Sequence, residues 1–222
     1  INTLPKPAAT TTYFVRVYNN ASGSASTEFT IKVFETPAFK LNTTIDTVCL
    51  KINNVVNPSF ENATVCPTGF VGSAVAGSLL LSNWRFPTTG TSDYFNACQT
   101  TGGNTIHIPS NLCFGSQEPR TGRGFVGLFA MFNNNYREYI QGELSTPMVP
   151  GKKYLVSYYV SLADFSNAAI DRMGIHFKIG STAINTSGPL SVSPQIESEP
   201  GAMLNERKGW VNISDIIEPT EA

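Results

Sequence analysis

Short runs of β-branched and aromatic residues, interrupted every few positions by Gly, Pro or Asn, set the fold class of this 222-residue chain. Successive side chains of a strand point to opposite faces of a sheet, so the period-two runs at residues 11–18 and 27–34 predict strands. No long window has the 3.6-residue periodicity of a capped amphipathic helix. The chain is therefore expected to be all-β.

Composition supports this expectation and excludes two classes of partner. The 18 Gly and 14 Pro residues suit turns between strands. The 15 Lys and Arg residues nearly balance 16 Asp and Glu, and they form no basic cluster that would attract a nucleic acid. The least polar run, residues 71–81, is interrupted by Gly and Ser and is too short to span a membrane. We expect no nucleic-acid partner and no membrane span.

The first two strands are expected to pair as a hairpin around residues 19–25. A two-stranded hairpin is barely stable alone in water, so it needs a partner face from a neighbouring domain or chain. The hairpin resembles the closing strands of immunoglobulin-like domains of bacterial surface proteins. The resemblance implies that residues 1–36 are the C-terminal part of such a domain. Pro37 and the following Thr- and Asn-rich residues predict a linker over 37–47.

The second expected domain spans residues 48–222 and has the strand spacing of a two-sheet sandwich. Long loops are expected at 88–122 and 181–207, and loops of that length carry function or are cross-linked. Its six expected strands lie at residues 79–86, 124–132, 136–144, 154–163, 173–179 and 210–214.

The cysteines predict the compartment. Cys49, Cys66, Cys98 and Cys113 lack the CxxC or Cys/His spacing of a zinc or redox site, which favours disulfides and an extracellular or outer cell-surface location. From the sequence, all three ways of pairing four cysteines stay open, and so does the alternative of four buried free thiols.

Several motifs of the second domain together resemble a known family. Asn-Pro-Ser-Phe-Glu at 57–61 is similar to the opening of galactose-binding-like jelly rolls, the fold of many carbohydrate-binding modules. With the later motifs, the chain resembles exported jelly-roll domains of Bacteroidota surface proteins, which occur beside immunoglobulin-like repeats and type 9 secretion sorting tails. These later motifs lie at 66–70, 83–84, 88–98, 114–117, 121–124, 136–141, 150–154 and 169–174.

The resemblance implies a jelly-roll β-sandwich that lacks its last strand, because the usual closing sequence is absent before residue 222. It also implies the pairing Cys66–Cys98, which leaves Cys49 with Cys113. Asp46-Thr47-Val48 resembles the O-glycosylation signal of exported Bacteroidota proteins, which makes Thr47 a candidate glycosylation site in the linker.

In the same family, the Glu of the opening motif helps to hold a structural Ca²⁺, an ion that prefers oxygen ligands. Glu61 occupies that position, and Asp171 is the candidate second carboxylate. The alternative is that Glu61 is a turn carboxylate that accepts hydrogen bonds from backbone N–H groups.

A glycan site is expected by the same analogy, because sugars stack on aromatic rings and bind polar side chains through their hydroxyls. In residues 136–141, strand alternation would place Tyr136 and Glu138 on one face and Arg137 and Tyr139 on the other. If the first face is core, Glu138 is buried and must pair, and if the second face is core, Arg137 must pair. The alternative for all the aromatic residues is the core itself. The candidate ligand-binding residues are Trp84, Tyr94, Arg137 and Tyr139.

No motif for catalysis is present. His107 and His176 belong to no nucleophile elbow, metal-binding HExxH helix or Cys–His arrangement. We therefore do not expect an enzyme, and this includes a hydrolase. The sequence predicts a non-catalytic module of a secreted surface protein that serves adhesion or glycan binding, with glycans, other surface proteins and neighbouring domains as partners. The alternative is a structural filament subunit, or a type 9 secretion cargo segment, completed by strands from neighbouring chains.

Overall fold

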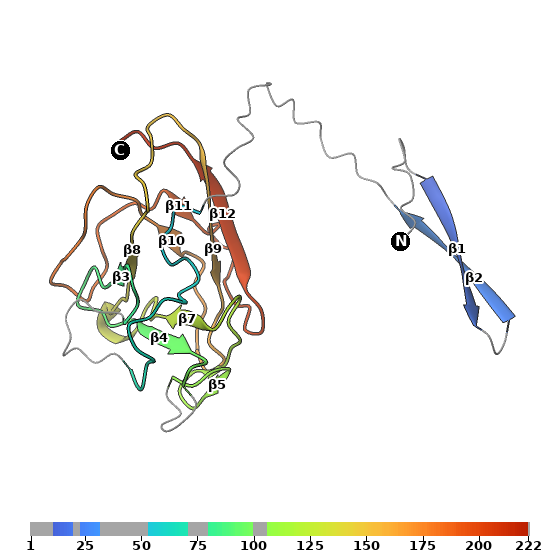
Figure 1. Ribbon diagram of the computed structural model, residues 1–222, viewed down its shortest axis with the longest axis horizontal. Helices are drawn as coiled ribbons and strands as arrows, with labels where there is room; N and C mark the ends of the chain where they lie inside the picture. Colours follow the sequence, from blue (N-terminus) through green and yellow to red (C-terminus); the bar gives the residue numbers. More distant parts are fainter. Residues whose placement is uncertain (1–10, 20–22, 32–52, 71–79, 100–105, 222) are drawn as a thin grey trace. The chain divides into compact units, whose positions relative to one another are not determined.

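The computed structural model describes residues 11–19, 23–31, 53–70, 80–99 and 106–221 (Figure 1). These residues form strands and one 3₁₀ helix, η2 (Asn133–Asn135), so the described chain is all-β as expected. The chain divides into two units, Ile1–Lys51 and Ile52–Ala222, close to the expected domain start at residue 48. Thr47 and Cys49 lie outside the described residues.

The first unit contains the expected hairpin. Strands β1 (Thr11–Asn19) and β2 (Gly23–Ile31) are antiparallel, and their register pairs Tyr13 with Phe29. The second strand begins at Gly23 rather than at the expected residue 27, because the small residues that follow Gly23 continue the pairing with β1.

The second unit has ten described strands. They pair antiparallel, as β3–β8, β4–β7, β5–β6, β9–β12 and β10–β11, each a sheet of two strands among the described residues. The strands are β3 (Trp84–Arg85), β4 (Asp93–Asn96), β5 (Ser110–Asn111), β6 (Gly115–Ser116), β7 (Gly124–Gly127), β8 (Gln141–Gly142), β9 (Tyr154–Val160), β10 (Gly174–Ile175), β11 (Ile196–Glu197) and β12 (Val211–Ile217).

Each of the six expected ranges overlaps a strand. Five of these strands are shorter than expected, whereas β12 continues beyond the expected end at residue 214 to Ile217. The two expected loops were wrong in part, because β4, β5 and β6 lie within 88–122 and β11 lies within 181–207. Strand β4 forms through pairing with β7, about 30 residues away, and such a distant partner leaves no local periodicity in the sequence.

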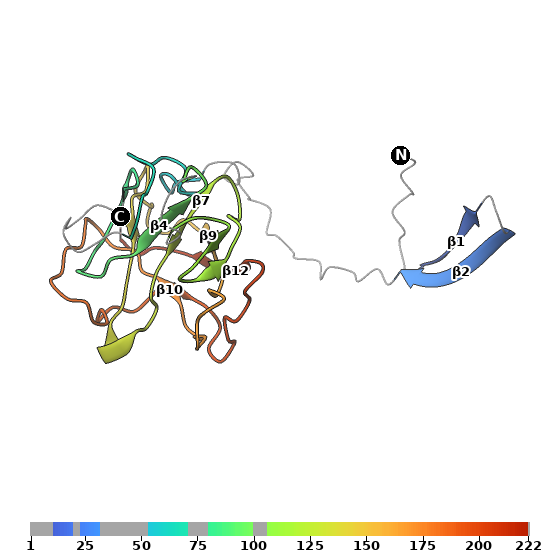
Figure 2. The same cartoon turned by 90° about the horizontal axis from the view of Figure 1, so that it is seen from below.

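Three apolar clusters form the core of the second unit. Successive side chains of β4 point to opposite faces, so Tyr94 packs in the first cluster and Phe95 in the second. This short strand therefore contacts both clusters. The third cluster lies under β9 and β12, the long pair on one side of this unit in Figures 1 and 2. The buried members are Leu81, Phe86 and Tyr94 in the first cluster, Phe95, Ile106 and Ile108 in the second, and Ile196, Ile213 and Ile217 in the third.

Strand β9 has the alternation of a one-sided sheet. Tyr154, Val156, Tyr158 and Val160 pack on the third cluster, while the residues between them are exposed. On the outer face, Leu155 lies opposite Ile216 in the ladder, and both are about 60% exposed. Within the part of the chain that the structure describes, no helix is long and apolar enough to cross a membrane.

Candidate functional site

The opening motif folds into a loop held by one asparagine. Asn57 is 7% exposed and has a φ of 53°, a left-handed conformation that Asn tolerates. Its side-chain oxygen accepts from the N–H of Asn62 at 3.0 Å, and its amide donates to the carbonyl oxygens of Asn62 and Ser82. The loop from Asn57 to Asn62, called here the opening loop, is therefore fixed by side-chain to backbone bonds.

Trp84 packs against this loop and does not form an open binding surface. Its indole N–H donates to the carbonyl oxygen of Asn57 at 3.0 Å, and its ring lies 5.0 Å from that of Phe60. The half-buried ring packs on the first core cluster. Trp84 was expected either to bind a ligand or to belong to the core, and in the structure it packs against the core.

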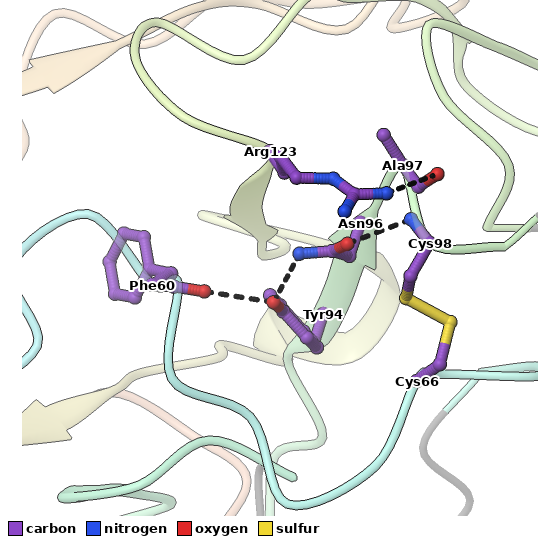
Figure 3. The surroundings of a disulfide bond; sticks show 7 residues. All are labelled: Phe60, Cys66, Tyr94, Asn96, Ala97, Cys98 and Arg123. Carbon is purple, nitrogen blue, oxygen red and sulfur yellow. Dashed lines mark hydrogen bonds between the residues drawn. A yellow bond between two sulfur atoms is a disulfide. The ribbon is translucent and has the colours of Figure 1, made fainter.

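Tyr94 also holds the opening loop, through its hydroxyl group (Figure 3). Its hydroxyl donates to the carbonyl oxygen of Phe60 at 2.8 Å and accepts from the side-chain amide of Asn96 at 2.6 Å. Burial raises the pKa of Tyr94, and its exposed fraction is 1%. A ring buried to this extent does not stack on a sugar, so the expected ligand-binding role of Tyr94 is replaced by a structural one.

A disulfide lies beside this network. Cys66 and Cys98 are bonded, as the resemblance implied, and the N–H of Cys98 donates to Asn96 at 2.8 Å (Figure 3). Cys113 is exposed and free, so the expected Cys49–Cys113 pair is not formed in the structure. Cys113 lies in the exposed connection between β5 and β6, and Cys49 lies outside the described residues.

Glu61 and Asp171, the expected calcium ligands, bind different loops. One oxygen of Glu61 accepts from the N–H groups of Arg123 and Gly124, at 2.8 and 3.2 Å. Asp171 accepts from the N–H of Gly201 at 3.0 Å. Glu61 thus accepts hydrogen bonds from backbone N–H groups of a turn, as in the alternative interpretation given for this residue.

No group of three or more His, Cys, Asp or Glu side chains suited to a metal occurs among the described residues. Ca²⁺ binding stays a prediction, and its test is whether a chelator lowers the midpoint of thermal unfolding.

An irregular hairpin built on three asparagines forms the next feature. Asn134 and Asn135 have φ values of 56° and 62°, and these two left-handed residues reverse the chain within η2. The N–H of Phe132 donates to the carbonyl oxygen of Tyr136 at 2.9 Å, and the N–H of Glu138 donates to that of Phe129 at 2.9 Å. The turn therefore brings the aromatic residues on its two sides next to each other.

This hairpin borders an open hollow of about 450 Å³. The volume lies within the range of small-ligand sites. Phe70 and Phe132 are 43% and 53% exposed, so aromatic surface is accessible at the hollow. The lining residues are Phe70, Thr91, Asp93, Phe129, Phe132, Asn133, Asn134, Tyr136 and Glu138.

Glu138 is the buried polar group of the hollow, with 5% of its surface exposed. Its two oxygens accept from the Tyr136 hydroxyl at 2.9 Å and from the N–H of Phe129 at 2.7 Å. The Tyr136 hydroxyl in turn accepts from the N–H of Thr91 at 3.1 Å. The conditional prediction for this segment is confirmed, since Glu138 is buried and hydrogen-bonded.

Arg137 and Tyr139, two of the expected ligand residues, do not line the hollow. The Arg137 guanidinium donates to the carbonyl oxygen of Ala130 at 2.6 Å, and the Tyr139 hydroxyl accepts from the N–H of Leu190 at 3.2 Å. Gly90 packs against the backbone here, and a Cβ at this position would lie 2.6 Å from the carbonyl oxygen of Arg137. Both side chains therefore fix neighbouring loops.

Sequence reasoning missed the aromatic residues that face the hollow. Phe70, Phe129 and Phe132 were not among the expected ligand residues, and Tyr136 was only placed on the same strand face as Glu138. The available signal was the run Phe-Asn-Asn-Asn-Tyr at 132–136, since three asparagines between aromatic residues predict a tight turn that pairs the rings.

Comparisons with protein-family models, curated proteins and solved structures found no match for this chain.

Proposed function

We propose that this chain is a non-catalytic glycan-binding module of an exported surface protein and that the hollow beside η2 is its binding site. The observation that carries the proposal is the lining of the hollow, which combines accessible aromatic rings with amide, hydroxyl and carboxylate groups. Sugars present apolar C–H faces that suit aromatic rings, and hydroxyls that suit Asn, Asp and Thr side chains.

The proposed location and domain type have separate support. The Cys66–Cys98 disulfide suits an oxidising, extracellular compartment. The jelly-roll assignment, and the placement in a multidomain adhesin of the Bacteroidota type, rest on the motif resemblance and on the described antiparallel strands. Glycans and neighbouring surface domains are the partners that this proposal requires.

A glycan array tests the proposal with the full 222-residue chain. Phe132→Ala should weaken binding to any recognised glycan about tenfold, because the variant removes an exposed ring of the hollow. Phe165→Ala is the matched control, since Phe165 is 61% exposed and does not line the hollow. Absence of any glycan binding, or equal loss in both variants, would contradict the proposal.

A second candidate is a structural subunit completed by strands of neighbouring chains. The observation that favours it is the β9–β12 ribbon, in which the strands pair only with each other among the described residues and Leu155 and Ile216 are exposed. Light scattering on the full chain separates the candidates. Assembly that Leu155→Lys abolishes would support the second candidate, and a monomer at all concentrations would contradict it.

A further inference from the structure

The hollow has a charge of one sign. Asp93 and Glu138 line it, and none of its described lining residues is Lys, Arg or His. Resting on the glycan-binding function proposed above, we propose that the hollow selects sugars that carry a protonated amino group over the same sugars in acetylated or acidic form. This selectivity depends on the environment of Glu138 and on the aromatic rings around it.

Among the residues that the structure describes, Glu138 has hydrogen-bond partners but no counter-ion. The ion pair found in the described residues joins Arg85 to Glu143, and the partners of Glu138 are a hydroxyl and a backbone N–H. A buried carboxylate without a cation loses hydration that neutral donors replace only in part. A cationic group of a ligand in the hollow would supply the missing charge.

The rings of the hollow are suited to the same cation. The face of an aromatic ring carries partial negative charge, and an ammonium group within about 6 Å of its centre is attracted to it. The rings of Phe129 and Phe132 lie 5.0 Å apart, and Tyr136 lies opposite Phe132 across the turn. Because the Tyr136 hydroxyl donates to a carboxylate, its ring becomes more electron-rich.

These groups also discriminate against acids. A uronic acid or a sialic acid would bring a carboxylate next to Glu138 and Asp93, and like charges that are partly removed from water repel. N-acetylation leaves the sugar neutral, so an acetylated ligand would keep its contacts with the rings but lose the attraction to the carboxylates. The predicted order of affinity is amine, then acetamide, then acid.

Isothermal titration with two matched probes tests this order on the full chain. The probes are β-1,4-linked tetramers of glucosamine and of N-acetylglucosamine, compared in a mildly acidic buffer of low ionic strength. The glucosamine tetramer should bind about tenfold more tightly, and added salt should reduce the difference because salt screens partly exposed charges.

Glu138→Gln should reduce the ratio of the two affinities to about one while binding of the acetylated tetramer persists. Asp93→Asn changes the second carboxylate of the lining and serves as the test if Glu138→Gln does not fold. It should lower the ratio of the two affinities, but not as far as one. Glu118→Gln removes an equal charge outside the hollow and should leave the ratio unchanged. Equal binding of the two tetramers by the parent chain would overturn charge selection and leave glycan binding intact, whereas no binding to any array glycan would overturn both.

Discussion

Two regions of the second unit are stabilised in different ways. The described part of residues 53–145 contains strands of two to four residues, and its loops are fixed by side chains that bond to the backbone and by the Cys66–Cys98 disulfide. In the region 146–221, the seven-residue strands β9 and β12 pair along their full length over one apolar cluster. The candidate glycan site belongs to the first region, where individual side chains decide the path of the chain.

Single side chains are expected to matter more where the chain lacks a long regular ladder. A regular ladder distributes its hydrogen bonds over the backbone, so most single side chains on its outer face are replaceable. In the opening loop, by contrast, one buried asparagine makes three bonds to the backbone. Single substitutions should therefore have larger effects in the first region than on the outer face of the β9–β12 ribbon.

Removal of the disulfide should produce the largest effect. The double variant Cys66→Ala with Cys98→Ala opens a loop with a sequence separation of 32. The free energy of unfolding should fall by roughly 3–4 kcal/mol, because the unfolded chain gains conformational freedom. Denaturant unfolding without reductant measures the change, and Cys113→Ala, at an exposed free cysteine, is the control.

Hydrogen exchange on the same double variant measures the stability of the two regions separately. Amide protection should decrease in residues 80–99 while the β9–β12 ladder keeps its protection. An equal loss of protection in both regions would show that they unfold as one cooperative unit and are not stabilised independently.

Asn57→Ala should have the next largest effect, a loss of about 2–4 kcal/mol. It removes three hydrogen bonds that are partly buried, takes their side-chain partner from the N–H of Asn62 and the carbonyl of Ser82, and places Ala at a φ of 53°. Asn212→Ala is the matched control, since Asn212 is exposed on β12 and should change stability by about 0.5 kcal/mol or less. Similar losses in both variants would remove the distinction between loop and ladder.

Tyr158→Phe tests a side chain under the ladder and should cost about 1 kcal/mol at neutral pH. The Tyr158 hydroxyl donates to the carbonyl oxygen of Met173 at 2.5 Å, and Phe lacks this donor. Tyr159→Phe, on the outer face of the same strand, keeps the ring that contacts Arg120 and should have no measurable effect.

The same residue predicts a pH dependence. Burial, and to a smaller extent Glu197, raise the pKa of Tyr158 from 10.0 to about 12. Because the folded state favours the protonated hydroxyl, its stabilisation is complete below pH 10 and is lost as the pH rises from 10 through about 12. The variant Tyr158→Phe should lose less stability than the parent chain over that interval, and parallel curves would contradict the prediction.

The sequence predicted the two regions unequally. Strand β9 and the core under it follow from period two, because burial of one face imposes that pattern. The path of the opening loop does not follow from periodicity. It depends on the hydrogen bond from the Asn57 side-chain amide to the carbonyl oxygen of Ser82, which lies 25 residues later in the chain. The family resemblance gave the correct Cys66–Cys98 pair, which spacing alone left open.

The candidate site was predictable only in part, for a similar reason. Alternation identified Glu138 as a residue that must pair if it is buried, and it does pair. The hollow, however, also requires Phe70 and Thr91, which reach it from other segments of the chain. Local pattern cannot bring such segments together, and Trp84 and Tyr94, chosen as exposed aromatics, are held in the core by hydrogen bonds of their own.

The smallest effect is expected for Glu206→Gln, in the turn before β12. One oxygen of Glu206 accepts from the N–H groups of Lys208 and Gly209, at 2.7 and 2.8 Å, and the bond from Gly209 is the main reason that its pKa lies below 4.5. A lowered pKa means that the folded state favours the charged form, so the stabilisation is present above pH 4.5 and is lost as the pH falls through the folded-state pKa.

Gln keeps an acceptor oxygen but loses the charge, so Glu206→Gln should lower the melting temperature slightly at neutral pH and should match the parent chain in acid. Glu199→Gln is the control, and differential scanning fluorimetry across this pH range measures both variants. A large loss would mean that the turn before β12 depends on one side chain as strongly as the opening loop does. Local hydrogen bonds as well as the apolar face would then determine the register of the β9–β12 ladder. Both regions would depend on individual side chains, and they would differ only in how strongly.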